Sequence, residues 1–248
     1  MSSSTPITTN AKNSTSVSRV LTLAGVSKKR GAAFVLKNID LGLEPGKTLA
    51  ILGPSGCGKT TLLQMMAGLE TATSGTLVND AEKTAYVFQE DRLVPWATVY
   101  GNLALVRKKN DAQKIAGLLA AVGLDGVKTQ LPAALSGGMK QRCALARALY
   151  FEAPLLLLDE PFRSQDLGMR KNLVQQLKDI QQAEKTAIAL VTHDLEDALE
   201  LADDIVVLSG KPAQVIGRLS IGIEKEERDL SSPRMQGFRW QLEGMLVL

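Results

Sequence analysis

The sequence has little of what marks secreted, membrane-spanning or nucleic-acid-binding chains. Its two cysteines, Cys57 and Cys143, do not form the spacing of a disulfide framework, so we expect a reducing cytosol. No apolar run approaches the roughly 20 residues that a membrane-spanning helix needs, and we expect a chain that does not itself cross a membrane. The formal net charge of +3 comes without a dense basic run, which argues against a nucleic-acid partner.

The first 18 residues lack the apolar segment of a signal peptide and are rich in serine and threonine. This composition is typical of a disordered polar tail. The remaining residues, 19–248, are enough to bury one good core, and the apolar and charged fractions of the chain are ordinary for a globular protein. We predict a single folded domain there.

Short apolar runs predict the buried strands of an α/β fold. The runs are TLAIL (48–52), AYVF (85–88), LLLL (155–158), AIALVT (187–192) and DIVVL (204–208). Runs this short, separated by helical patterns, are typical of a mostly parallel sheet with helices on both faces. The alternating stretches before them, VLTLAGVS and FVLKNIDLGLEPG, predict a small antiparallel sheet near the N-terminus.

Residues 93–153 have helical periodicity and no convincing strand. The apolar residues at helical spacing are Ile115, Leu118, Leu119 and Val122. We predict a helical subdomain inserted between two parts of the α/β core, residues 19–92 and 154–232. The last stretch, 233–248, is predicted to be a packing helix, because three apolar residues fall near one face: Phe238, Leu242 and Met245.

The stretch GPSGCGKTT fits the pattern of a phosphate-binding P-loop, with an apolar strand before it and a helical pattern after it. Its glycines let backbone N–H groups surround phosphate oxygens, Lys59 supplies charge for the β and γ phosphates, and the Thr60 hydroxyl can bind Mg²⁺. A chance glycine turn is the alternative, which the flanking strand and helix make improbable. The expected nucleotide-binding residues are Gly53, Pro54, Ser55, Gly56, Cys57, Gly58, Lys59, Thr60 and Thr61.

A second anion-binding helix start is predicted in LSGGMKQR, from Leu135 to Arg142. Ser136 can cap the first free N–H groups of a helix, and the helix dipole favours negative charge at that end. This second site contains no lysine corresponding to Lys59, so the sequence raises the question of what it binds.

Two carboxylates, Asp159 and Glu160, follow the apolar run LLLL. Beside a P-loop, an aspartate at that point holds Mg²⁺ and the next carboxylate can polarise the attacking water. Standing alone, Asp-Glu-Pro would be an ordinary turn at a strand end.

Single polar residues follow two other predicted strands. His193, the only histidine, comes after AIALVT, and Gln89 comes after AYVF. In open α/β sheets, ligands bind at the carboxyl ends of strands, so His193 is a candidate site residue, although a lone histidine is more often incidental. The Gln89 amide could meet Mg²⁺ or the water, and a surface glutamine is the alternative.

Together, GPSGCGKTT, VFQ, LSGGMKQR, LLLLDEP and VTHD occur in an order and spacing that resemble the ATP-binding subunits of ABC transporters. The resemblance runs from about Val20 to the C-terminus. It implies an ATPase with Mg²⁺ as cofactor, and a P-loop core that carries a small antiparallel β-subdomain and an inserted helical subdomain.

The resemblance also answers the question of the second anion site. In this family two subunits pair head to tail, and the signature helix of one chain caps the γ phosphate on the P-loop of the other. Ser136, Gly137 and Gly138 would therefore act on the nucleotide of a second copy of this chain. The dimer would close on ATP and open after hydrolysis.

The family roles transfer to the matching positions of this sequence. They make Glu160 the catalytic base and let His193 contact the γ phosphate. Thr60 and Gln89 would approach Mg²⁺, and Asp159 would support it.

Three stretches depart from the family pattern. An aromatic residue usually stacks on adenine where Arg30 stands; a guanidinium can also stack on a base, and Phe34 is the alternative contact. The loop after Asp-Glu-Pro usually reads Ser-Ala-Leu-Asp, whereas residues 163–166 read Arg-Ser-Gln-Asp, at contacts that link the two sites of the dimer. The segment between Gly75 and Gln89 is shorter than usual, which predicts a trimmed antiparallel sheet.

Within the family, FQEDRLVPWATVYGNL resembles importers of sulfonate, taurine, nitrate and related small solutes. This branch implies a membrane permease as partner, a solute-binding protein indirectly, and a peripheral position at the cytoplasmic face of the membrane. An exporter or a lipoprotein-extracting complex is the alternative. A soluble ABC protein that acts on DNA or ribosomes is less favoured, because the chain has no coiled-coil insertion or second nucleotide domain.

A Pro-Trp pair at the start of a predicted short helix is an unusual place for a large apolar ring unless something covers it. We expect Val94, Trp96 and Tyr100 to line a groove that receives a short helix of the permease. The alternative is that Trp96 packs back onto its own helical subdomain.

Overall fold

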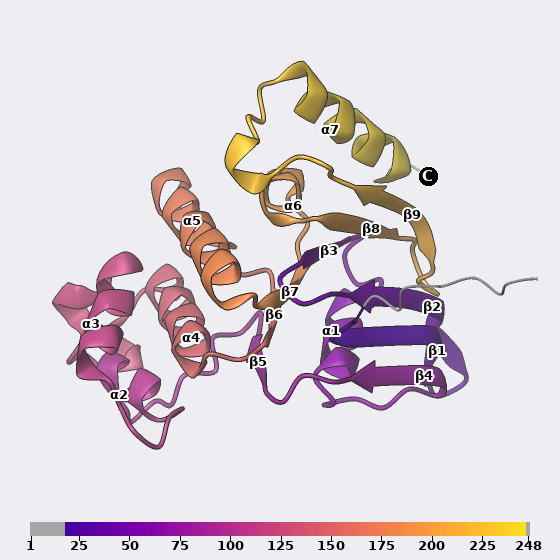
Figure 1. Cartoon of the computed structure of the whole chain (residues 1–248). Coiled ribbons are helices and arrows are strands. Elements are labelled where there is room, and N and C mark those ends of the chain that lie inside the picture. The colour runs from indigo at the N-terminus through magenta and orange to yellow at the C-terminus, as the bar shows by residue number, and fades with distance from the viewer. Residues whose placement is uncertain (1–17, 247–248) are drawn as a thin grey trace, which may run out of the picture.

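The computed structural model describes residues 18–246. It contains two β-sheets with helices packed against them (Figure 1). The larger sheet has the strand order β5-β6-β7-β3-β8-β9. Its strands are β3 (Thr48–Leu52), β5 (Thr84–Val87), β6 (Leu155–Asp159), β7 (Ala187–Val191), β8 (Asp204–Leu208) and β9 (Val215–Ser220). All are parallel except β9, which pairs with β8 in the antiparallel sense. The predicted apolar runs are therefore the parallel strands of an α/β fold. The tail predicted for residues 1–18 lies outside the described residues except for its last residue.

Alternate residues of the central strands face opposite layers of helices, which is why these strands are apolar throughout. In β6, Leu155 and Leu157 share a core with helix α1, whereas Leu156 and Leu158 face helices α4 and α5. Helices α6 and α7 cover the same face as α4 and α5, over β3 and β8. The helices are α1 (Lys59–Met66), α4 (Gly137–Phe151), α5 (Leu167–Glu184), α6 (Leu195–Leu201) and α7 (Pro233–Leu246).

The smaller sheet is antiparallel, as predicted, and has the strand order β2-β1-β4. Its strands are β1 (Leu21–Arg30), β2 (Ala33–Leu43) and β4 (Ser74–Asn79). Leu23 and Leu41 of this sheet share one apolar core with Leu63 and Met66 of α1. Helix α1 therefore lies between the two sheets, and the loop that precedes it is held from both sides.

The predicted helical insertion is present and lies on the side of the molecule away from the small sheet (Figure 1). It contains α2 (Val99–Ala104), α3 (Ala112–Ala121), two 3₁₀ turns (Asp125–Val127 and Pro132–Ala134) and α4. Ile115, Leu119 and Val122 are buried against residues of α4, including Leu145 and Tyr150. The apolar stripe seen in the sequence is thus the inner face of α3.

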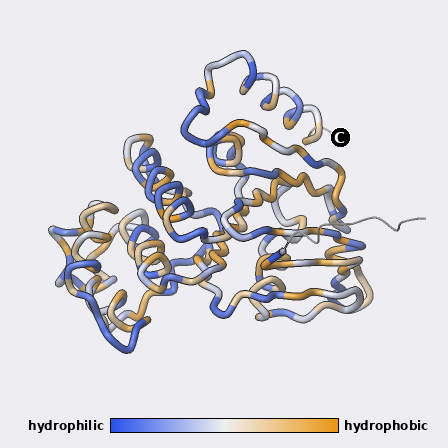
Figure 2. The backbone as a smooth tube through the Cα atoms, in the orientation of Figure 1, coloured by the Kyte–Doolittle hydropathy of each residue, from blue (hydrophilic) through white to orange (hydrophobic). Residues whose placement is uncertain are grey.

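The C-terminal part adds a third apolar cluster above β3 and β8. After β9 and a 3₁₀ turn (Lys225–Glu227), helix α7 packs through the buried Met235 and Leu242, with Phe238 and Met245 beside them. Figure 2 shows hydrophobic colour along the strands of both sheets, whereas α5 is largely hydrophilic. None of the helices within residues 18–246 has the length and apolar character needed to cross a membrane.

Candidate functional site

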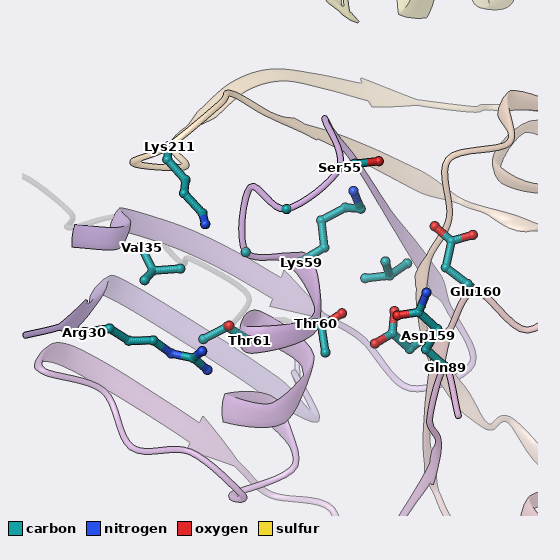
Figure 3. A pocket seen from close by; sticks show the side chains of 13 residues that line it. Arg30, Val35, Ser55, Lys59, Thr60, Thr61, Gln89, Asp159, Glu160 and Lys211 are labelled. Atoms are coloured by element: carbon teal, nitrogen blue, oxygen red, sulfur yellow. The ribbon is translucent and has the colours of Figure 1, made fainter. Parts of the chain in front are cut away.

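A cavity of about 330 Å³ lies beside the glycine-rich loop between β3 and α1 (Figure 3). Its walls include six residues of the predicted P-loop: Ser55, Gly56, Gly58, Lys59, Thr60 and Thr61. Gln89 after β5 and the neighbours Asp159 and Glu160 at the end of β6 complete the wall on the other side. The cavity therefore lies at the carboxyl ends of parallel strands, the expected position for a ligand in an open α/β sheet.

The loop approaches its neighbours so closely that side chains would not fit at two of its glycines. A Cβ on Gly58 would lie 2.9 Å from a methyl group of Val35, and one on Gly53 would lie 2.9 Å from the Leu208 carbonyl oxygen. Both glycines have positive φ, 126° and 154°, which other residues rarely adopt. Cys57, between them, points into the core and is 2% exposed, so it is not part of the cavity wall.

The side chain of Lys59, at the C-terminal end of the loop, reaches back to the start of the loop. Its ammonium donates hydrogen bonds to the carbonyl oxygens of Gly53 at 2.7 Å and Pro54 at 3.0 Å, and the residue is 9% exposed. These bonds hold a positive charge among backbone groups that can also bind an anion, which is the arrangement that a phosphate-binding loop requires. Gly53 and Pro54 thus serve the site through their carbonyl groups.

Asp159 is a buried carboxylate without its full set of partners. It is 1% exposed, and its Oδ2 accepts no hydrogen bond from any residue within 18–246. Burial raises the pKa of this carboxyl above its ordinary value, and the Glu160 charge acts in the same direction, whereas the Thr60 hydroxyl and the Lys59 ammonium oppose the shift. A buried oxygen of this kind is costly unless a cation or donor meets it. The neighbouring Thr60 hydroxyl and Gln89 amide supply further oxygen atoms, so the residues present fit Mg²⁺.

Glu160 is held in an unusual backbone conformation. Its φ is 52°, in the left-handed region that costs a non-glycine residue about 1 kcal/mol or more. Its N–H donates to the Val191 carbonyl oxygen at 2.9 Å, and its own carbonyl oxygen accepts from the Gln141 side chain at 2.7 Å. These two hydrogen bonds, one to the backbone N–H and one to the backbone carbonyl oxygen of Glu160, hold its backbone in place and so fix the direction of its side chain.

The structure brings His193 and Glu160 together. The His193 Nδ1 lies 2.7 Å from a carboxylate oxygen of Glu160, whose side chain is 14% exposed, while that of His193 is 68% exposed. When both ring nitrogens carry a proton, Nδ1 donates to Glu160 and Nε2 can donate to an anionic ligand. His193 does not line the cavity itself and reaches it through Glu160.

The predicted signature helix begins as expected, at a capping serine. The Ser136 Oγ accepts a hydrogen bond from the N–H of Met139, and α4 follows from Gly137. Ser136 and Gly137 are exposed, and neither they nor Gly138 line the cavity beside Lys59. Within one chain, the two predicted anion sites are separate.

The altered loop 163–166 packs on this helix start. A Cβ on Gly138 would lie 2.9 Å from the Ser164 carbonyl oxygen. The Gln165 side chain donates to the Gly138 carbonyl oxygen at 3.1 Å and to the Gln141 side chain at 3.2 Å. Because Gln141 in turn holds Glu160, a chain of hydrogen bonds connects the loop, the signature helix and the predicted base. The sequence pointed to the loop that contains Gln165 and to the motif LSGGMKQR that contains Gln141, but it gave neither glutamine a role of its own.

At the other end of the cavity, Arg30 and not Phe34 faces the open space (Figure 3). Arg30 lines the cavity and lies 3.4 Å from a carboxylate oxygen of Glu70. The ring of Phe34 is covered by the ammonium of Lys29, 4.5 Å from its centroid. Of the two predicted base contacts, Arg30 lines the cavity and Phe34 does not.

Trp96 is 81% exposed, so the alternative in which it packs back onto its own helical subdomain is wrong. Val94 and Tyr100, which are near it in the sequence, are half-buried, and Tyr100 lines a separate cavity with residues of α3. The fully buried Asn102 holds this segment, because its side chain bonds to the N–H of Val94 at 2.8 Å and to the Ala97 carbonyl oxygen at 3.0 Å. The ring of Trp96 is therefore presented to the exterior by a well-fixed turn.

A P-loop, a strand-end carboxylate pair, and a serine-capped glycine helix start in this arrangement define an ATP-binding cassette. A family model described as "ABC transporter" matches residues 36–163, and the chain belongs to that family. It is an ATPase with the P-loop fold of these cassettes.

Relatives with assigned names cover most of the chain. An "Aliphatic sulfonates import ATP-binding protein" of Pseudomonas savastanoi is 42% identical over 198 residues, 79% of this chain and 84% of that protein. A protein of the same name from Bacillus subtilis is 40% identical over 215 residues, 83% of this chain and 84% of its own length.

Solved structures agree with the fold. A dimeric bacterial ABC transporter cassette is 28% identical and has a TM-score of 0.74, over 82% of this chain and all of that one. A dimeric post-hydrolysis state of an ATP-binding cassette, bound to ADP and phosphate, is 26% identical with a TM-score of 0.73, over the same shares of the two chains.

Proposed function

We propose that this chain hydrolyses ATP to power the import of an aliphatic sulfonate, or a similar small solute such as taurine or nitrate, through a separate membrane permease. The observation that carries the proposal is the identity of 40–42%, over most of both chains, to proteins named for aliphatic sulfonate import. An exporter or a lipoprotein-extracting complex would use the same chemistry, and these names do not favour it.

The geometry of the cavity supports a division of roles among its residues. The loop and Lys59 bind the triphosphate, and Glu160 accepts a proton from the attacking water. The water oxygen bonds to the γ phosphorus, the bond from that phosphorus to the bridging oxygen breaks, and ADP and phosphate remain. With both ring nitrogens protonated, His193 donates from Nδ1 to the Glu160 carboxylate and from Nε2 to a γ-phosphate oxygen. Mg²⁺, held by Thr60, Asp159 and Gln89, would neutralise charge on the phosphates.

The exposed signature helix start supports a composite site in a dimer. We infer that Ser136, Gly137 and Gly138 cap the nucleotide of a partner copy, and their separation from Lys59 within one chain supports this inference. Mixing inactive Lys59→Ala chains with inactive Ser136→Arg chains should then restore ATPase activity, because one site of the mixed dimer keeps all its residues. Folded mutants that show no rescue at any ratio would contradict the trans arrangement.

The exposed ring of Trp96 supports the proposal that this ring, together with Val94 and Tyr100, contacts a short helix of the permease. This contact would hold the subunit at the cytoplasmic face of the membrane, and a solute-binding protein would act on the permease from the other side. Trp96→Ala should leave the ATPase rate and melting temperature of the isolated subunit nearly unchanged, yet release it from the permease. Unimpaired transport in this variant would rule the contact out.

Growth on one sulfur source tests the import function. A strain that lacks the gene should fail to grow with an aliphatic sulfonate as sole sulfur source and grow normally on sulfate. A gene copy that encodes the chain should restore growth, and a Glu160→Gln copy should not. Normal growth of the deletion strain on the sulfonate would exclude this solute class.

A further inference from the structure

One side chain at the nucleotide cavity belongs to no recognised motif. Lys211 lies on the turn between β8 and β9, at residues 209–214, and lines the cavity together with Arg30 and Val35. Figure 3 shows Lys211 reaching in from this turn and Arg30 from the end of β1, both on the side away from Asp159 and Glu160. This end of the cavity therefore carries two cations from opposite walls.

The turn is fixed against β2, so the position of its lysine is not left to a loose hairpin. The N–H of Ala213 donates to the Val35 carbonyl oxygen at 2.9 Å, and the N–H of Lys37 donates to the Ala213 carbonyl oxygen at 2.9 Å. The turn is closed by the N–H of Ser209, which donates to the Gln214 carbonyl oxygen at 2.9 Å. Val35 of β2 also lies against Gly58 of the P-loop. The turn that carries Lys211 and the P-loop are therefore both packed against the same residue of β2.

The one carboxylate that pairs with either of these cations within residues 18–246, Glu70, is shared between Arg30 and Lys28. Glu70, the acidic partner of Arg30, lies 3.4 Å from it but 2.6 Å from Lys28. Lys211 forms no ion pair with any residue of the described range 18–246. Like charges on facing walls repel each other, and this arrangement becomes favourable when a ligand rich in acceptor atoms lies between them.

We propose that Lys211 is a nucleotide-binding residue that donates hydrogen bonds to the nucleoside half of ATP, opposite Arg30. The proposal rests on the proposed binding of the triphosphate at Lys59, which leaves the nucleoside for the other end of the cavity. An ammonium group has three donors and no acceptor. Ribose oxygens and purine ring nitrogens are hydrogen-bond acceptors, so they can accept hydrogen bonds from the Lys211 ammonium.

Lys211→Met, with Lys37→Met as the matched control, tests the proposal. Lys37 is an exposed lysine on β2 beside the same turn, and it does not line the cavity. Lys211→Met should weaken ATP binding about fivefold in calorimetry and raise KM in proportion, with kcat within about twofold of wild type. Lys211→Arg should keep most of the affinity, and Lys37→Met should keep all of it.

Inorganic tripolyphosphate separates a nucleoside contact from a general attraction for phosphate, because it has the phosphates without the nucleoside. Wild type and Lys211→Met should bind it equally. An equal loss for tripolyphosphate and ATP would overturn the nucleoside assignment, and so would ATP affinity in Lys211→Met as high as in Lys37→Met. Wild-type protein that binds no ATP would instead overturn the proposed function, and the inference with it.

Discussion

The two ends of the nucleotide cavity are built in different ways. The phosphate end consists of a loop and two strand ends, and its charged side chains Lys59 and Asp159 are buried. The nucleoside end takes its cations Arg30 and Lys211 from segments far apart in the sequence, and both are exposed. The phosphate end is lined by charges of both signs, whereas the nucleoside end is lined by two cations, of which Arg30 shares Glu70 with Lys28. We propose that the phosphate end supplies the chemistry and most of the affinity, and that the nucleoside end adds smaller contributions that water screens.

The largest effect should come from the phosphate end, with Glu160→Gln. This change removes the base and keeps the shape, so ATP hydrolysis should fall by about 10²- to 10⁴-fold while ATP binding is retained. Steady-state phosphate release and calorimetry measure the two quantities. With ATP the variant should elute as a dimer on a sizing column. Turnover near the wild-type rate would remove Glu160 from the mechanism.

Lys59→Ala tests the binding role of the same end. The ammonium meets the triphosphate as a charge-assisted donor, so the affinity for ATP should fall by about 10- to 100-fold. An exposed control, Lys37→Ala, should bind ATP as wild type does. If Lys59→Ala binds ATP as tightly as the control, the assignment of the phosphate end is wrong.

At the nucleoside end the effects should be smaller. Arg30→Ala should weaken ATP binding by about threefold, whereas Arg30→Tyr should bind ATP equally or more tightly, because an aromatic ring can replace a guanidinium stacked on adenine. Titration of ATP into the three proteins checks both statements. If neither change alters the affinity, Arg30 does not stack on the base.

Asp159→Asn should show that the phosphate end costs stability when no ligand is bound. Burial raises the pKa of the Asp159 carboxyl, so the folded state disfavours its charged form. The resulting penalty is absent below the ordinary value of 3.8, grows as pH rises through the window up to the folded-state pKa, and is complete above it. At pH 7 the nucleotide-free variant should therefore melt at a higher temperature than wild type.

A second measurement at low pH checks the cause of that gain. Because the raised pKa lets the wild-type carboxyl take up its proton at a higher pH than an ordinary carboxyl does, the difference in melting temperature should shrink as the pH is lowered from 7 to near 4. Scanning calorimetry at both pH values compares the two proteins. A variant that melts below wild type at both values would contradict an unpaired charge at Asp159.

The contrast between the two ends also explains what the sequence could predict. The strands and the P-loop follow from local patterns, because a fully buried strand is apolar throughout and a phosphate loop needs glycines followed by lysine and threonine. Asp159 was accessible to this reasoning because it directly follows a buried strand. The lack of a hydrogen-bond partner at its Oδ2 within residues 18–246 could not be predicted from the sequence, because it depends on where every neighbouring donor lies in the folded structure.

Other contacts join segments that no local pattern relates. The bond between Gln141 and the Glu160 carbonyl oxygen depends on which face of α4 meets the end of β6. Lys211 reaches the cavity only because its turn is bonded to β2 through Ala213. The family pattern has an aromatic residue at the position of Arg30, which makes Arg30 a candidate contact for adenine. No sequence motif points to Lys211.

A structure of the Glu160→Gln variant with Mg²⁺ and ATP tests the division of the cavity most directly. The account predicts phosphates on the loop at Lys59, the metal ion at Thr60 and Asp159, and the nucleoside between Arg30 and Lys211. Phosphates bound elsewhere, or a nucleoside that contacts neither of these two cations, would contradict it.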